Sequence, residues 1–111
     1  MTIKHILIAE DDREMLIMMS DFLKTKGYMI STATTESQIN SVLNAKRVDL
    51  ILLDVMLGFE NGIQICQNIR RDSSIPIILV SALSADNQKM DGYDVGADDY
   101  ISKPFNPDLL L

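Results

Sequence analysis

Short apolar runs alternate with amphipathic stretches along the whole chain, and this alternation restricts the fold more than any other feature. Runs rich in Ile, Leu and Val predict strands at residues 5–9, 28–33, 48–54, 75–81 and 99–103. The stretches between them repeat apolar residues at helical spacing, which predicts helices at 13–26, 35–46, 61–71 and 84–95. Strands that alternate with helices form right-handed βαβ units, so the sequence predicts a doubly wound α/β domain with a five-stranded parallel sheet.

Local signals mark the ends and the relative strength of the predicted helices. Gly27 is a good C-terminal cap for the first helix, and Thr34 is the candidate N-cap of the second. Cys66 falls on the apolar stripe of the third helix, which predicts a small core residue. The stretch 84–95 is polar and holds Gly92, so we expect its helix to be the least stable of the set.

Length and composition exclude several classes of protein. A chain of 111 residues forms one domain with a single core. It has no apolar run of the roughly 20 residues that a membrane span needs, and its N-terminus lacks a secretory signal. One cysteine excludes an internal disulfide and fits a reducing cytoplasm. The net charge of −6 argues against binding of nucleic acid by this segment itself.

Polar side chains gather at one edge of the predicted sheet. In an open parallel sheet, ligands bind beyond the carboxyl ends of the strands. Those ends carry carboxylate, hydroxyl and ammonium groups: Glu10, Asp11 and Asp12, then Asp54, Ser81 and Lys103. Each could by itself be a turn residue, a helix cap or an exposed lysine. Their coincidence at four strand ends favours a shared site.

The residue types at this edge are those of phosphoryl transfer. Clustered carboxylate oxygens suit Mg²⁺, and the ion offsets the repulsion between Asp11 and Asp54. An aspartate can act as a nucleophile and become an aspartyl phosphate. The hydroxyl of Ser81 and the ammonium of Lys103 would bind the remaining phosphoryl oxygens. The sequence therefore predicts phosphoryl transfer to Asp54.

Four segments together resemble the receiver domains of bacterial response regulators, the CheY-like family of two-component signalling. They read ILIAEDD, DLILLDVML, PIILVSALSA and GADDYISKPF, and the resemblance spans essentially the whole chain. It implies a flavodoxin-like sheet with strand order 2-1-3-4-5. Receivers carry a complete fifth helix, which here is expected to begin in NPDLLL and to be truncated at Leu111. Residues 1–111 are accordingly expected to be the receiver domain at the N-terminal end of a longer response regulator.

The resemblance implies a role for each residue of the metal site. Asp54 matches the phosphoacceptor, and Asp11 and Asp54 match direct Mg²⁺ ligands, with Mn²⁺ able to substitute. Glu10 is expected to reach the ion through water, and the backbone carbonyl of Met56 to complete the protein ligands. Asp12 matches a position that is often acidic, and it could be a further ligand or only help the helix begin.

The resemblance also implies a phosphate-binding and switching set. Ser81 and Lys103 match the residues that bind the phosphoryl group. Tyr100 matches the aromatic switch residue that turns inward when Ser81 moves toward phosphate. The Lys103–Pro104 bond is expected to be cis, which aims the lysine into the site.

The function implied is that of a signalling switch rather than a metabolic enzyme. A sensor histidine kinase is expected to phosphorylate Asp54, and the face of helix 84–95 and strand 99–103 is expected to rearrange. The switch is expected to control an output domain beyond Leu111 that binds DNA and regulates transcription. The same face, together with the fifth helix, could also form a homodimer. The domain is expected to catalyse only its own phosphorylation and slow dephosphorylation. Leu57-Gly58 departs from the Leu-Pro of many receivers and is expected to loosen the loop after Asp54.

Two other functions are alternatives to the switch. A phosphatase of the haloacid dehalogenase type would place an Asp-x-Asp motif after the first strand and add a cap domain, and AEDDRE lacks that spacing. A flavin or nucleotide binder would need a Gly/Ser/Thr phosphate loop there. Three carboxylates have the wrong sign for direct contact with phosphate.

Overall fold

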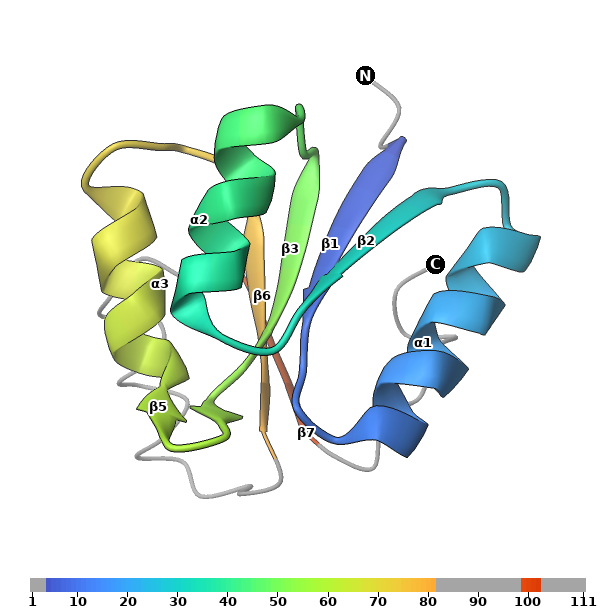
Figure 1. Cartoon of the computed structure of the whole chain (residues 1–111), viewed down its shortest axis with the longest axis horizontal. Helices are drawn as coiled ribbons and strands as arrows, with labels where there is room; N and C mark the ends of the chain where they lie inside the picture. Colours follow the sequence, from blue (N-terminus) through green and yellow to red (C-terminus); the bar gives the residue numbers. More distant parts are fainter. Residues whose placement is uncertain (1–3, 82–98, 103–111) are drawn as a thin grey trace.

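The structure, a computed structural model, describes residues 4–81 and 99–102, and these form a parallel sheet with helices on both faces (Figure 1). The strands of the main sheet are β1 (His5–Ala9), β2 (Met29–Ala33), β3 (Leu50–Asp54), β6 (Ile77–Ser81) and β7 (Asp99–Ser102). Their order is β2-β1-β3-β6-β7 and every pair is parallel. The predicted order 2-1-3-4-5 is thereby confirmed. The helices predicted at 84–95 and from Asn106 onward lie outside the described residues.

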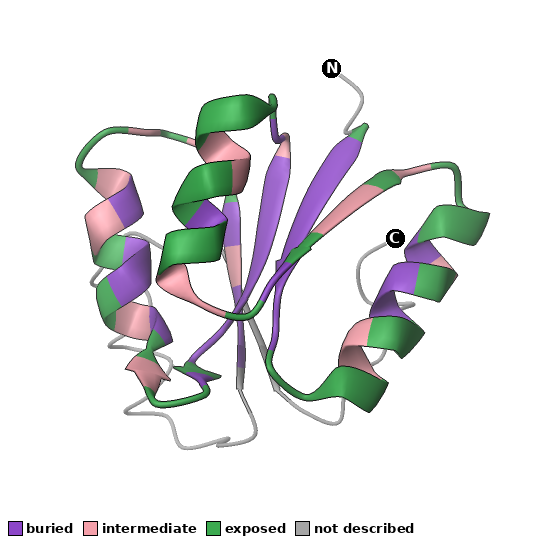
Figure 2. Ribbon diagram, in the orientation of Figure 1, coloured by how far each residue is buried: buried purple, intermediate pink, exposed green. Residues whose placement is uncertain are grey.

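Each central strand is buried on both faces, as its nearly continuous apolar sequence predicts. Because side chains alternate across a strand, β1 and β3 supply two separate clusters. The cluster under α2 (Glu36–Ala45) and α3 (Gly62–Arg70) includes Leu7, Ala9, Ile51 and Leu53. The cluster under α1 (Arg13–Thr25) includes Ile6, Ile8, Leu50 and Leu52. Strands β1 and β3 are therefore wholly buried, whereas the outer sides of the helices are exposed (Figure 2).

The helices bury the predicted stripes and begin at polar caps. Met19, Leu23 and Ile39 are buried, and Cys66 is buried in the core, as predicted. The prediction of Thr34 as the N-cap of α2 is wrong by one residue. Thr35 is the cap, because its side chain accepts a hydrogen bond from the Gln38 amide at 3.1 Å. The backbone of Thr34 donates instead to the Gln38 side chain at 2.8 Å.

A short hairpin, which the sequence analysis did not predict, follows the phosphoacceptor candidate directly. Strands β4 (Met56–Leu57) and β5 (Glu60–Asn61) pair antiparallel across a two-residue turn. Gly58 opens this turn with a φ of +63°, a conformation that glycine adopts without strain. The glycine that was expected to loosen this loop therefore forms the turn of a hydrogen-bonded hairpin.

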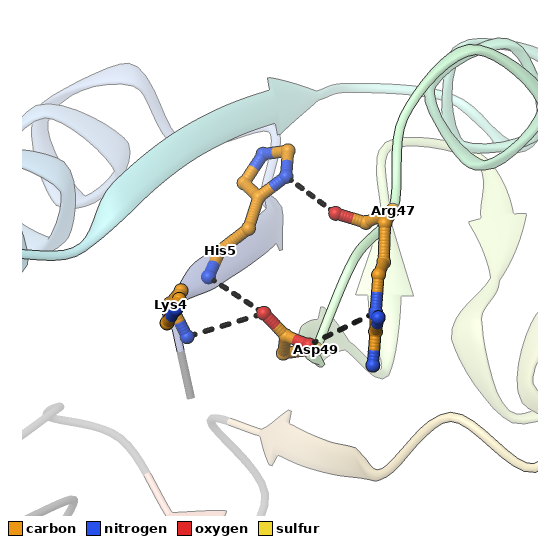
Figure 3. A network of polar contacts seen from close by, with 4 residues as sticks. All are labelled: Lys4, His5, Arg47 and Asp49. Atoms are coloured by element: carbon orange, nitrogen blue, oxygen red, sulfur yellow. Dashed lines mark hydrogen bonds and ion pairs between the residues drawn. The ribbon is translucent and has the colours of Figure 1, made fainter. Parts of the chain in front are cut away.

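The edge of the sheet opposite the predicted site is held by a polar network around Asp49 (Figure 3). The carboxylate of Asp49 accepts hydrogen bonds from the amides of Lys4 and His5 at 3.1 and 3.0 Å and lies 3.7 Å from the Arg47 side chain. The buried His5 ring contacts the Arg47 carbonyl at 2.8 Å and the Ser31 hydroxyl at 2.7 Å. The amides of Lys4 and His5 hold the pKa of Asp49 below its usual range.

Asp49→Asn is expected to lower the free energy of unfolding near neutral pH and to have little effect in acid. Because the pKa of Asp49 is depressed in the folded state, its charge stabilises the fold fully above the ordinary aspartate pKa. That contribution is lost as the pH falls through the lower pKa of the folded protein. Thermal melts of both proteins over this range check the expectation. A difference in melting temperature that stays constant as the pH falls contradicts it.

Candidate functional site

Three acids meet at the carboxyl ends of β1 and β3, at the lower edge of the sheet in Figure 1. The two strands are neighbours, with Ala9 paired to Leu53, so the residues that follow them are brought together. Carboxylate oxygens of Glu10, Asp11 and Asp54 all lie within 4.8 Å of one another. Such a set of hard oxygen atoms fits Mg²⁺ and could hold one ion.

The three acids differ in their exposure to solvent. Glu10 is 2% exposed and Asp54 is 4% exposed, whereas Asp11 is exposed. Like charges at this separation repel by an amount on the order of 1 kcal/mol or more, because burial lowers the effective dielectric constant. A divalent cation removes that repulsion, and access from solvent is on the side of Asp11.

Glu10 and Asp12 of the segment AEDDRE accept hydrogen bonds from different backbone amides. The carboxylate of Glu10 accepts hydrogen bonds from the amides of Asp11 and Asp12 at 3.0 and 3.3 Å. Asp12 is the N-cap of α1, and its side chain accepts from the Met15 amide at 3.2 Å. Asp12 therefore helps α1 begin. Glu10 is oriented by the backbone amides of the turn that leads into α1.

Asp54 is held by the backbone of the residues that follow it. One of its carboxylate oxygens accepts a hydrogen bond from the Met56 amide at 3.0 Å. Val55, between them, continues the sheet through a 2.9 Å hydrogen bond from its amide to the Val80 carbonyl. Met56 then enters β4, and its side chain is 61% exposed. Met56 therefore lies directly beside the acid cluster, where its carbonyl is predicted to act.

Gly62 packs against the backbone of the phosphoacceptor candidate. A Cβ atom at this position would lie far inside the van der Waals distance of the Asp54 carbonyl oxygen and 2.8 Å from the Val55 Cα. The Gly62 amide also donates to the Val55 carbonyl at 2.7 Å. The start of α3 is thereby locked onto the end of β3, which fixes the backbone from which the Asp54 side chain projects.

The remaining predicted residues lie on or just beyond β6 and β7. Ser81 is the last residue of β6 and is paired with Ser102, and Val80 before it is paired with Asp54. Tyr100 lies in β7, paired with Leu79. Lys103 and Pro104, with the predicted cis bond between them, lie outside the described residues. The topology therefore brings the end of β6 next to Asp54, as the sequence predicts.

Comparison with known proteins identifies the family. The family model for the response regulator receiver domain matches residues 6–111. The chain belongs to this family. The receiver is 44% identical over 104 residues to the transcriptional regulatory protein YvrH of Bacillus subtilis, with 92% of this chain and 44% of YvrH covered. It is 39% identical over 111 residues to the phosphate regulon transcriptional regulatory protein PhoB of Pseudomonas aeruginosa, with 97% of this chain and 48% of PhoB covered.

Solved structures of receiver domains have the same fold as this chain. The receiver domain of the TMAO respiratory system response regulator TorR superposes with a TM-score of 0.91 at 33% identity, covering 96% of this chain and 89% of that one. Receiver domains are signalling proteins, and they generally bind Mg²⁺. This receiver spans less than half the length of the two curated relatives named above. None of the helices formed by residues 4–81 is long and apolar enough to cross a membrane.

The residues that support the site rather than form it were not predicted from the sequence. Asn61 caps α3, since its side chain accepts from the amides of Ile63 and Gln64 at 2.9 and 3.3 Å. Glu60 contacts the N-terminus of α2. The letters GFENG do contain a glycine turn followed by an Asn cap, which is a recognisable signal for a hairpin that leads into a helix.

Proposed function

We propose that this receiver is a phosphorylation switch in which Asp54 accepts a phosphoryl group with the help of Mg²⁺. The observation that carries the proposal is the meeting of Asp54 with Glu10 and Asp11 within 4.8 Å at the carboxyl edge of the sheet. A lone buried aspartate would be an ordinary strand end. A buried aspartate beside two further acids, in a chain of this family, has the composition of a metal-assisted phosphoacceptor.

The covalent step would be transfer of one phosphoryl group from a histidine side chain of the kinase to the Asp54 carboxylate. A carboxylate oxygen of Asp54 forms a bond to the phosphorus of a phosphohistidine while the P–N bond breaks. The released imidazole nitrogen keeps the electron pair and takes up a proton. The Met56 amide orients the Asp54 carboxylate, and the amides of Asp11 and Asp12 orient Glu10.

The metal would be held by Asp11, Asp54 and the Met56 carbonyl, with Glu10 reaching it through water. When bound, Mg²⁺ supplies positive charge that offsets the acids and the incoming phosphoryl oxygens. Mn²⁺ is expected to substitute for it.

Two further side chains and a switch complete the proposal. Ser81 and Lys103 would bind the phosphoryl oxygens, and Tyr100 and a cis Lys103–Pro104 bond would couple them to the face of strand β7. This part rests on the resemblance of PIILVSALSA and GADDYISKPF to receivers and on the pairing of Val80 with Asp54. The free energy of switching has to come from phosphate contacts that differ between two states.

The proposed partners follow from the relatives. YvrH and PhoB are transcriptional regulators about twice the length of this chain. We infer that residues 1–111 are the receiver domain of a longer cytoplasmic regulator whose DNA-binding output domain follows Leu111. A sensor histidine kinase would be the donor. We also propose that the regulator forms a homodimer through the face that includes β7.

The direct test is phosphorylation by a small donor. Incubation with acetyl phosphate and Mg²⁺ is expected to give stoichiometric phosphate that is acid-stable and labile to hydroxylamine, as an acyl phosphate is. Removal of the metal with EDTA is expected to reduce the rate by at least about 100-fold, because the acids then repel the donor. Intact-protein mass spectrometry measures both results.

The same experiment separates the alternatives. If no acyl phosphate forms in the presence of Mg²⁺, the switch proposal is contradicted. Steady turnover of a phosphomonoester, with inorganic phosphate released far beyond one equivalent, would favour the phosphatase instead. A coloured cofactor that copurifies with the chain would favour the flavin binder.

A further inference from the structure

Glu60 joins the hairpin beside the site to the helix that follows β2. Its carboxylate accepts a hydrogen bond of 2.7 Å from the Glu36 amide, across 24 residues of sequence. Glu36 is the first residue of α2, so this amide is one of those that a helix leaves without an internal partner. A carboxylate at this end also interacts favourably with the helix dipole. Glu60 therefore acts as a tertiary anchor for β5.

The same contact continues into α3. The side chain of Glu36 accepts a hydrogen bond from the Asn68 side chain at 2.8 Å, and Asn68 accepts one from Gln64 at 3.0 Å. Glu60 and Glu36 are half-buried, so these hydrogen bonds are partly shielded from water. The hairpin, the start of α2 and the side of α3 that carries Asn68 are thus joined on one face of the sheet (Figure 1).

This anchor bears on the hairpin that carries Met56. Glu60 pairs with Leu57 and Asn61 pairs with Met56, so the position of β5 sets that of β4. The turn between them begins at Gly58, where many receivers have a proline that stiffens the loop. A tether on β5 can supply the stiffness that the glycine does not.

We propose that Glu60 is a positioning residue for the metal site: its hydrogen bond to the α2 N-terminus fixes the β4–β5 hairpin and thereby the Met56 carbonyl. The inference rests on the proposed function, in which that carbonyl is a Mg²⁺ ligand. It predicts that Mg²⁺ affinity depends on the hydrogen-bond acceptor at position 60, although the Glu60 side chain is not a ligand itself.

The test is a Mg²⁺ titration of the metal-free protein by calorimetry. Glu60→Ala removes the acceptor and is expected to weaken Mg²⁺ binding by about three- to tenfold, as loss of one hydrogen bond would. Glu60→Gln keeps an acceptor oxygen without the charge and is expected to bind within about twofold of wild type. Equal weakening in both variants would overturn the proposal, because it would show that the negative charge and not the anchor matters.

A matched control removes a comparable anchor from the far edge of the sheet. Asp49→Ala breaks the hydrogen bonds to Lys4 and His5 and is expected to lower the melting temperature while Mg²⁺ affinity stays within about twofold of wild type. If Asp49→Ala weakens Mg²⁺ binding as much as Glu60→Ala does, the effect is general destabilisation and the proposal fails.

A measurement on the unmodified protein keeps the proposal testable if Glu60→Ala does not fold. Coupling between two sites is reciprocal, so Mg²⁺ should slow hydrogen exchange of the Glu36 amide as well as that of Met56. We expect protection of Glu36 to rise by about three- to tenfold at saturating Mg²⁺, to match the coupling above. Protection of Met56 without any change at Glu36 contradicts the inference. Wild type that binds no Mg²⁺ at all contradicts the proposed function itself.

Discussion

Asp54→Asn is expected to abolish acyl phosphate formation, with incorporation from acetyl phosphate and Mg²⁺ falling by at least about 100-fold. An amide is no nucleophile toward phosphorus, and it supplies one neutral oxygen where the carboxylate supplies a charged pair. The fold should survive, because the Asn oxygen can still accept the hydrogen bond from the Met56 amide. Mass spectrometry after a fixed incubation measures the loss.

The same substitution is expected to stabilise the metal-free protein. It removes one of three mutually repelling charges, two of which are almost fully buried, so the free energy of unfolding should rise by roughly 1 kcal/mol. Mg²⁺ should raise the melting temperature of wild type and have little effect on the variant, since a ligand stabilises only the state that binds it.

Asp12→Asn is the matched control for this experiment. It removes the same charge from the adjoining turn, and asparagine caps a helix as well as aspartate does. Phosphate incorporation should therefore stay within about twofold of wild type. The phosphoacceptor is assigned to the wrong carboxylate if Asp54→Asn incorporates as much phosphate as wild type does. The same holds if Asp12→Asn loses as much incorporation as Asp54→Asn.

Gly62→Ala is expected to be the most destabilising single-methyl change among the glycines of the described residues. Gly62 is the first residue of α3, where alanine would otherwise favour the helix by about 1 kcal/mol. The added Cβ instead overlaps the Asp54 carbonyl oxygen and lies close to the Val55 Cα. These are backbone atoms, which cannot rotate away as the end of a side chain can. We expect a loss of about 3 kcal/mol and a fall in melting temperature of roughly 10 °C.

The position of this clash should make the change visible in function as well as in stability. Separating α3 from β3 moves the backbone that carries Asp54 and breaks the hydrogen bond from the Gly62 amide to the Val55 carbonyl. Phosphorylation of the folded fraction should therefore slow by about tenfold or more, because misplacement by one ångström is enough for such losses. Quench-flow measurements well below the melting temperature of the variant would detect it.

Gly27→Ala provides the comparison. Gly27 follows α1 with a φ of +93°, and a Cβ there would meet nothing within 4 Å. Its cost should be only the backbone strain of about 1 kcal/mol, with the phosphorylation rate unchanged. If Gly62→Ala costs no more than Gly27→Ala, the close packing of α3 on Asp54 does not hold in solution.

The sequence by itself determined where the strands lie and which polar residues follow them. Short apolar runs are local patterns, so the runs at 5–9 and 48–54 predicted β1 and β3 to within two residues. The rule that the carboxyl ends of parallel strands lie at one edge then predicted that Glu10 and Asp54 lie together. For Asp12 the sequence left two roles open, and the hydrogen bond from the Met15 amide shows that it caps α1.

The tertiary structure decided how those residues are held. Whether Thr34 or Thr35 caps α2 depends on which of them Gln38 engages, and both fit the local pattern. The anchor from Glu60 to Glu36 and the approach of Gly62 to Asp54 are invisible to any periodicity, since a glycine and a polar loop residue have many ordinary uses. Contacts between segments far apart in the chain become specific only when packing sets the distance between them, and that distance is what gives the site its geometry.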